Sequence, residues 1–76
     1  MNKNTEAAIG KNIRNIREQK GMTQELLATR FQLEGIDITR SAVAKIEVGQ
    51  RHIYVDELIA LQKILNVPFD EILNTK

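Results

Sequence analysis

The chain has 76 residues, a formal net charge of +1, one histidine and no cysteine. This length allows one small domain, and the composition excludes disulfides and a cysteine–histidine metal site as the means of stabilising it. No apolar run approaches bilayer length and the N-terminus is polar, so we expect a cytoplasmic protein that lies outside membranes. The near-neutral charge also means that any surface for nucleic acid must be a local patch.

The first predicted helix begins near Asn4 or Thr5, either of which can cap it. Gly21 suits the position just after the end of this helix, where a left-handed backbone conformation is common. The buried face is expected to consist of isoleucines spaced as i, i+4 and i+7: Ile9, Ile13 and Ile16.

A second helix is predicted to begin after a cap at Thr23 and to end near Leu33 or Glu34, with Gly35 following it. Its expected buried residues are large and apolar: Leu26, Leu27 and Phe31. Residues 36–38 alternate apolar and polar, which indicates an extended connection with one or both isoleucines turned inward.

A third helix is predicted from a cap at Thr39 to about Val48, with Gly49 ending it. Its inner stripe is Ala42, Val43 and Ile46. Its outer face is small, polar and basic: Arg40, Ser41, Ala44 and Lys45.

A fourth helix begins around Asp56 and Glu57, whose charges suit a helix N-terminus, and Pro68 suits the first turn of a fifth. The fourth helix offers four aliphatic residues to the core: Leu58, Leu61, Ile64 and Leu65. The fifth is expected to cover the bottom of the core: Phe69, Ile72 and Leu73. No segment has sustained strand alternation, so we predict an all-α fold of five helices in one domain, residues 1–76, with its core in about 5–73.

Three segments resemble, in the right order, the phage-repressor type helix-turn-helix domain of the Xre/Cro/CI family. They are IREQKGMTQELLA at 16–28, SAVAKIEVGQR at 41–51 and LIALQKILNVP at 58–68. The resemblance covers residues 9–73 and implies a compact, lambda-repressor-like domain in which the second and third helices form the helix-turn-helix. The chain departs from the family's pattern at two places. The link between Ala28 and Glu47 is longer than usual in the family, with the extra residues around 33–38. Tyr54 stands where the family often has a serine that caps the fourth helix.

The resemblance implies that the outer face of the third helix reads bases in the major groove. Arg40 can donate two hydrogen bonds to guanine O6 and N7, and Lys45 can donate to guanine or to a phosphate. Ser41 can bond either class of base, and Ala44 can contact a thymine methyl group. Without the resemblance the same residues would be an ordinary solvent-exposed helix face.

The resemblance also implies phosphate contacts on both sides of this helix. Gln24 lies just after the cap of the second helix, where free backbone N–H groups favour an anion. Gln50, Arg51 and His52 follow the third helix, and Arg51 is the best candidate among them. Thr39, at the start of the third helix, belongs to the same predicted DNA-binding surface.

Glu47 is expected to have a structural partner. It lies near the C-terminal end of the third helix, where the helix dipole opposes an acid. In the resembling family an arginine of the first helix, here Arg17, pairs with this glutamate in a partly buried ion pair. The alternative is two unrelated surface charges.

The function predicted from the sequence is sequence-specific binding of double-stranded DNA by a transcriptional regulator, as a repressor and as a homodimer at least on DNA. The alternative is an antitoxin-like or regulatory interaction module with a protein partner, which uses the same fold to regulate its own synthesis. An enzyme is not expected, because the sequence has no Ser/His/Asp set, glycine-rich phosphate loop or metal cluster. No cofactor is predicted.

Overall fold

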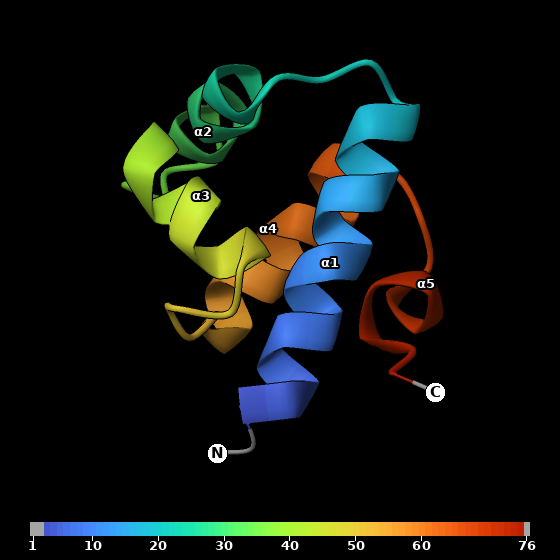
Figure 1. Ribbon diagram of the computed structural model, residues 1–76. Coiled ribbons are helices and arrows are strands. Elements are labelled where there is room, and N and C mark those ends of the chain that lie inside the picture. Colours follow the sequence, from blue (N-terminus) through green and yellow to red (C-terminus); the bar gives the residue numbers. More distant parts are fainter. Residues whose placement is uncertain (1–2, 76) are drawn as a thin grey trace.

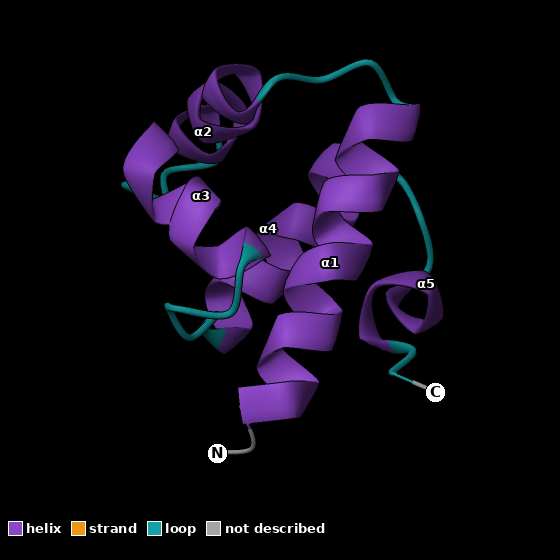
Figure 2. Ribbon diagram, in the orientation of Figure 1, coloured by secondary structure: helices purple, strands orange, loops and turns teal. Residues whose placement is uncertain are grey.

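The computed structural model describes residues 3–75. This part of the chain contains five helices and no strand (Figure 1). Their bounds are α1 Lys3–Gln19, α2 Gln24–Leu33, α3 Arg40–Glu47, α4 Val55–Leu65 and α5 Phe69–Leu73. The predicted all-α, five-helix fold is confirmed, and short loops join the helices throughout (Figure 2). None of these helices combines the length and apolar character that a membrane span needs.

The long helix α1 organises the packing. It lies between α3 on one side and α5 on the other, with α4 behind it (Figure 1). Helix α2 packs against both α3 and α4. This arrangement holds α3 by its inner side and leaves the opposite side of the helix at the surface.

The core is aliphatic apart from one phenylalanine, and each helix contributes at least one apolar side chain to it. The largest fully buried residues are Ile13, Leu27, Phe31, Ile38, Val43, Leu61, Leu65 and Ile72. Three predicted core residues are wrong: Leu26, Phe69 and Leu73 are 37, 40 and 41% exposed. Helix α5 spans only 5 residues, and Ile72 is the one that it buries, because a single short turn presents one narrow side to the core.

Threonine caps begin α2 and α3, as predicted. Thr23 Oγ1 accepts a hydrogen bond from the Leu26 N–H at 3.0 Å, and Thr39 Oγ1 accepts one from the Ala42 N–H at 3.1 Å. The predicted cap of α1 at Asn4 or Thr5 is wrong, because the helix already includes Lys3.

The start of α5 differs from the prediction, and α4 begins without a side-chain cap. Pro68 is the cap residue of α5 and lies outside its first turn. Tyr54 makes no side-chain cap for α4, as its sequence position indicated. Instead, the Glu57 carboxylate accepts a hydrogen bond from the Tyr54 N–H at 3.0 Å.

The connection between α2 and α3 is tied to α2 by hydrogen bonds. Gly35, at φ 82°, follows the end of α2, and the Ile36 N–H donates to the Phe31 carbonyl at 3.0 Å. These bonds are typical of a helix that ends in a left-handed residue. The Gln32 side chain then donates to the Ile38 carbonyl at 3.2 Å, and Ile38 itself is 1% exposed. The longer link is therefore an ordered segment that fixes where α3 begins.

Helices α1 and α3 pack tightly at Gly10. A Cβ atom on this residue would lie 2.2 Å from the Ile46 carbonyl oxygen and 2.8 Å from the Glu47 carbonyl oxygen. The packing of Gly10 against α3 was not predicted from the sequence. A glycine inside a helix costs about 1 kcal/mol relative to alanine. Its presence within the predicted first helix was therefore a sign that another segment packs closely there.

Candidate nucleic-acid interface

The outer face of α3 is exposed where the sequence predicted it. Arg40, Ser41 and Lys45 are exposed and Ala44 is half-buried, while Val43 on the inner face is 1% exposed. Helical spacing places these outer residues on one side of α3. Val48, just past the end of the helix and 56% exposed, continues the same side and was not singled out from the sequence.

Thr39 lies at the exposed start of this face. Its hydroxyl oxygen accepts the hydrogen bond that caps α3, which leaves the hydroxyl hydrogen able to donate elsewhere. Arg40 follows as the first helical residue, and no carboxylate within residues 3–75 forms an ion pair with it. The N-terminal end of α3 therefore presents a hydroxyl and an unneutralised guanidinium side by side.

The inner side of α3 carries a buried ion pair with α1. Arg17 Nε donates to Glu47 Oε2 at 2.7 Å, and Arg17 Nη2 donates to Glu47 Oε1 at 3.0 Å. The two side chains are 8% and 1% exposed. The hydrogen bond to Glu47 raises the pKa of Arg17 above its ordinary value, although burial acts in the opposite direction. Such a two-bond pair is directional and sets the angle between the helices.

The same arginine also holds the turn between α1 and α2. Arg17 Nη1 donates to the Met22 carbonyl at 2.7 Å, one residue before the cap of α2. Every buried side-chain nitrogen and oxygen in residues 3–75 has a hydrogen-bond partner. The ion pair is thus part of a fully bonded polar cluster, which is the condition for burying charge without a large penalty.

Gln24, the predicted phosphate contact, belongs to this cluster. It is the first residue of α2 and is half-buried, and its Nε2 donates to Glu47 Oε1 at 3.0 Å. The sequence indicated a residue facing phosphate and did not anticipate this hydrogen bond. An amide nitrogen has two hydrogens, so one remains for another acceptor.

Arg51, the preferred phosphate contact in the loop after α3, is bound by a carboxylate. Its Nη1 donates to Glu57 Oε1 at 2.8 Å and its Nη2 to Glu57 Oε2 at 3.0 Å. Its guanidinium carbon also lies 5.5 Å from the centre of the Tyr54 ring, within cation–π range. The hydrogen bond to Glu57 raises the pKa of Arg51, against the effect of its burial. This residue therefore joins the loop to α4, which the sequence analysis missed.

Glu57 stays ionised in a buried position because of these contacts. Burial alone would raise its pKa, but the hydrogen bonds from Arg51 and from the Tyr54 N–H outweigh it and lower the pKa overall. The side chain is 7% exposed. Its charge also neutralises much of the charge that Arg51 could offer to DNA.

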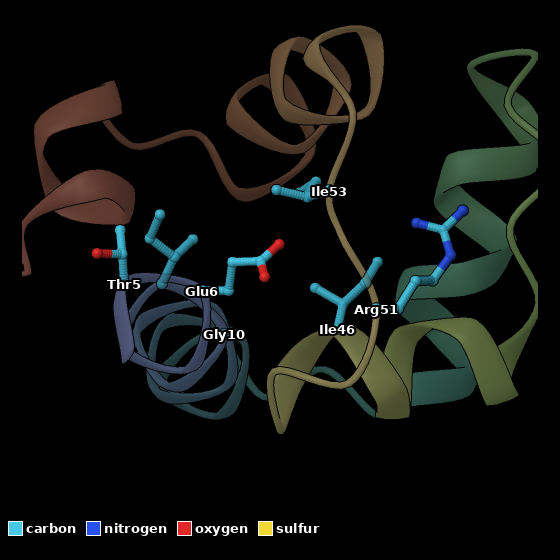
Figure 3. A pocket seen from close by; sticks show the side chains of 7 residues that line it. Thr5, Glu6, Gly10, Ile46, Arg51 and Ile53 are labelled. Atoms are coloured by element: carbon cyan, nitrogen blue, oxygen red, sulfur yellow. The ribbon is translucent and has the colours of Figure 1, made fainter. Parts of the chain in front are cut away.

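The other two loop residues, Gln50 and His52, are exposed. The His52 ring nitrogen Nδ1 contacts a carboxylate oxygen of Glu6, which ties the loop to the start of α1. Figure 3 shows the Glu6 side chain projecting from α1 into a pocket of about 60 Å³ beside Ile46 and Ile53. Within residues 3–75 no group of three acidic, histidine or cysteine side chains lies close enough to hold a metal ion.

Comparison with known families identifies the domain. A family model described as Helix-turn-helix, HTH_3, matches residues 13–72. The chain belongs to this helix-turn-helix family, which is of the Xre/Cro/CI type. The match spans the second half of α1, all of α2, α3 and α4, and most of α5, so the resemblance predicted from the sequence is confirmed. Comparisons with curated proteins and with solved structures gave no match.

Membership of this family establishes the general function. The chain is a DNA-binding transcription regulator. Helices α2 and α3 are the two helices of its helix-turn-helix.

Proposed function

We propose that this protein is a sequence-specific repressor that places α3 in the major groove of double-stranded DNA. One observation carries this proposal: α3 is held by a buried ion pair and apolar side chains on one side, while its other side is polar, basic and exposed. A helix of this kind fits the major groove, which is about 12 Å wide.

Arg40 is the principal base-reading residue in this proposal. It lies at the N-terminal end of α3, which is the end of a recognition helix that approaches base edges, and its charge is not neutralised within residues 3–75. It would donate two hydrogen bonds to a guanine. Lys45 and Ser41 would read neighbouring bases, and the small apolar side chains of Ala44 and Val48 suit thymine methyl groups.

Phosphate contacts would set the register of the helix. Gln24 is at the N-terminus of α2, where the first backbone N–H groups have no acceptor within the helix. On the other side of α3, Gln50 is exposed, and His52 is exposed although its ring contacts the Glu6 carboxylate. Both are more accessible than Arg51, whose guanidinium is bound by Glu57. We retain Arg51 as a weaker phosphate contact and assign its main role to the loop. The Thr39 hydroxyl completes the proposed surface.

A homodimer at least on DNA is part of the proposal, since one recognition helix reads only a few base pairs. Two copies on a two-fold site would place their half-sites about 34 Å apart, one turn of DNA. Exposed Val55 and Ile59, 74 and 51% exposed on one side of α4, are suited to contact another protein surface. They also favour the alternative of an antitoxin-like module with a different protein as its partner.

Selection of bound fragments from random duplex DNA tests the proposed function. We expect enrichment of a two-fold symmetric sequence, and affinity that falls steeply as salt rises because bound counterions are released. Arg40→Ala should relax the preference at one base pair in each half-site, costing about 1–3 kcal/mol there. No enriched sequence, together with salt-independent binding, would refute the proposal.

A matched lysine pair sharpens the test. Lys45→Ala removes a charge from the proposed interface, whereas Lys63→Ala removes an exposed charge on α4 that pairs with Glu34 at 3.5 Å. We expect the first variant to bind DNA more weakly and the second to bind as wild type does. Recovery of one stoichiometric protein partner that competes with DNA would favour the antitoxin-like alternative.

A further inference from the structure

Polar side chains from two helices, α1 and α2, converge on the carboxylate of Glu47. Arg17 donates from α1 at 2.7 and 3.0 Å, and Gln24 donates from the first residue of α2 at 3.0 Å. Glu47 itself is the last residue of α3, and its side chain is 1% exposed. A single buried group therefore connects the proposed phosphate contact with the proposed base-reading helix.

The carboxylate cannot easily change its orientation, because both of its oxygens accept hydrogen bonds from Arg17. Arg17 in turn is held by the Met22 carbonyl at 2.7 Å. The Gln24 amide thus bonds to an acceptor that is itself fixed on two sides. Its remaining N–H is directed by this bond, and less conformational freedom is lost when it meets a further acceptor.

The charges within the cluster also suit an approaching anion. An unpaired Glu47 close to the N-terminus of α2 would repel a phosphate. Because the guanidinium of Arg17 neutralises it, the cluster presents the neutral amide of Gln24 and the positive end of the α2 dipole to the surface.

We propose that Glu47 is a positioning residue for DNA: its hydrogen bond holds the Gln24 amide in the orientation that binds a backbone phosphate. This role rests on the proposed function and adds to the structural pairing of Glu47 with Arg17. It makes the phosphate contact and the recognition helix one rigid unit, so that the register set on the backbone is transmitted to the bases.

The test is a mutant cycle in DNA affinity with Gln24→Ala, the paired replacement Arg17→Met with Glu47→Leu, and the combination of all three; the paired replacement removes the acceptor and leaves no buried charge. The probe is a fluorescein-labelled duplex of random sequence at low salt, because phosphate contacts act without regard to sequence. Gln24→Ala should weaken binding about tenfold in the wild-type background, as expected for a lost hydrogen bond to a charged group. In the Arg17→Met, Glu47→Leu background, where position 47 has no oxygen to accept from the amide, Gln24→Ala should weaken binding by less than about twofold.

Gln19→Ala is the matched control, since Gln19 is an exposed glutamine at the end of α1, and it should leave affinity unchanged in both backgrounds. Equal losses from Gln24→Ala in the two backgrounds would overturn the positioning role while leaving DNA binding intact. A wild-type protein that does not bind the duplex at all would instead overturn the proposed function, and the positioning role with it.

A second measurement uses the free wild-type protein and does not depend on how well the paired replacement folds. Relaxation of the side-chain amide ¹⁵N nuclei should give Gln24 an order parameter near that of rigid backbone, about 0.85, and Gln19 one below about 0.6. A Gln24 amide as mobile as that of Gln19 would overturn the proposal.

Discussion

Removal of the Glu47 carboxylate gives the most direct test of how this domain is held together. Glu47→Ala deletes the acceptor of two hydrogen bonds from Arg17 and one from Gln24. The guanidinium of Arg17, on a side chain that is only 8% exposed, would then keep just its bond to the Met22 carbonyl. The variant therefore leaves a largely buried positive charge without a counter-charge.

The expected loss is large relative to the stability of so small a domain. Breaking one side of a buried ion pair costs roughly 3–5 kcal/mol. A chain of 76 residues has a total unfolding free energy of roughly 4–11 kcal/mol, at 0.05–0.15 kcal/mol per residue. With a shift of roughly 4–8 °C for each kcal/mol, Tm should fall by at least about 12 °C, and the variant could be unfolded at 37 °C.

Urea and thermal unfolding followed by circular dichroism at the helical band measure this loss. The control is Glu18→Ala, which breaks an exposed pair with Arg14 at 3.4 Å and should cost no more than about 1 kcal/mol. Replacing both partners, as Arg17→Met with Glu47→Leu, should recover most of the lost stability because no charge remains buried. A Glu47→Ala protein that melts within a degree or two of wild type would refute the reasoning.

Three further predictions concern the rest of the fold. Gly10→Ala should lower stability by about 1–3 kcal/mol, because its Cβ would lie 2.2 Å from the Ile46 carbonyl oxygen; a melting temperature at or above that of wild type would contradict the close packing of α1 on α3. Asn12→Ala should speed amide hydrogen exchange in α5 but not in α2, because the side chain donates to two carbonyls at the end of α5 at 3.0 and 2.6 Å; equal acceleration in both helices would count against it. Glu57, whose pKa is lowered in the folded state, stabilises the fold above its unfolded-state pKa of about 4.3 and loses this contribution as pH falls through the folded-state value. The stability difference between wild type and Glu57→Gln should therefore narrow below about pH 4, and a difference that is constant from pH 7 to pH 3 would show that the bonds to Arg51 do not stabilise its charge.

The helical elements were predictable because their signals are local. Thr23 and Thr39 satisfy N–H groups three residues ahead, and a threonine needs no tertiary contact to do so. Gly35 and Gly49 adopt φ values of 82° and 77° just after α2 and α3, which a glycine accepts without strain. Apolar spacing then identified the inner face of α3 correctly, with Val43 buried.

The errors arose where burial depends on neighbours that are distant in the sequence. Leu26 follows the apolar pattern of α2, yet no other helix covers it fully and it is 37% exposed. Phe69 and Leu73 flank the buried Ile72 on a helix too short to turn three side chains inward. Periodicity reports which residues share a face, but the area of that face that is covered depends on where the adjoining helices lie.

The sequence by itself determined the order of the helices, where α2 and α3 begin, and the face of α3 that meets the surface. Only the tertiary structure decided which arginine side chains have a charge available for contact with DNA. Arg17 and Arg51 each form two hydrogen bonds with a buried carboxylate, whereas Arg40 pairs with none in residues 3–75. Three identical side chains acquire different roles because the field at each guanidinium depends on the distance to carboxylates that folding brings near, and local sequence does not encode that distance.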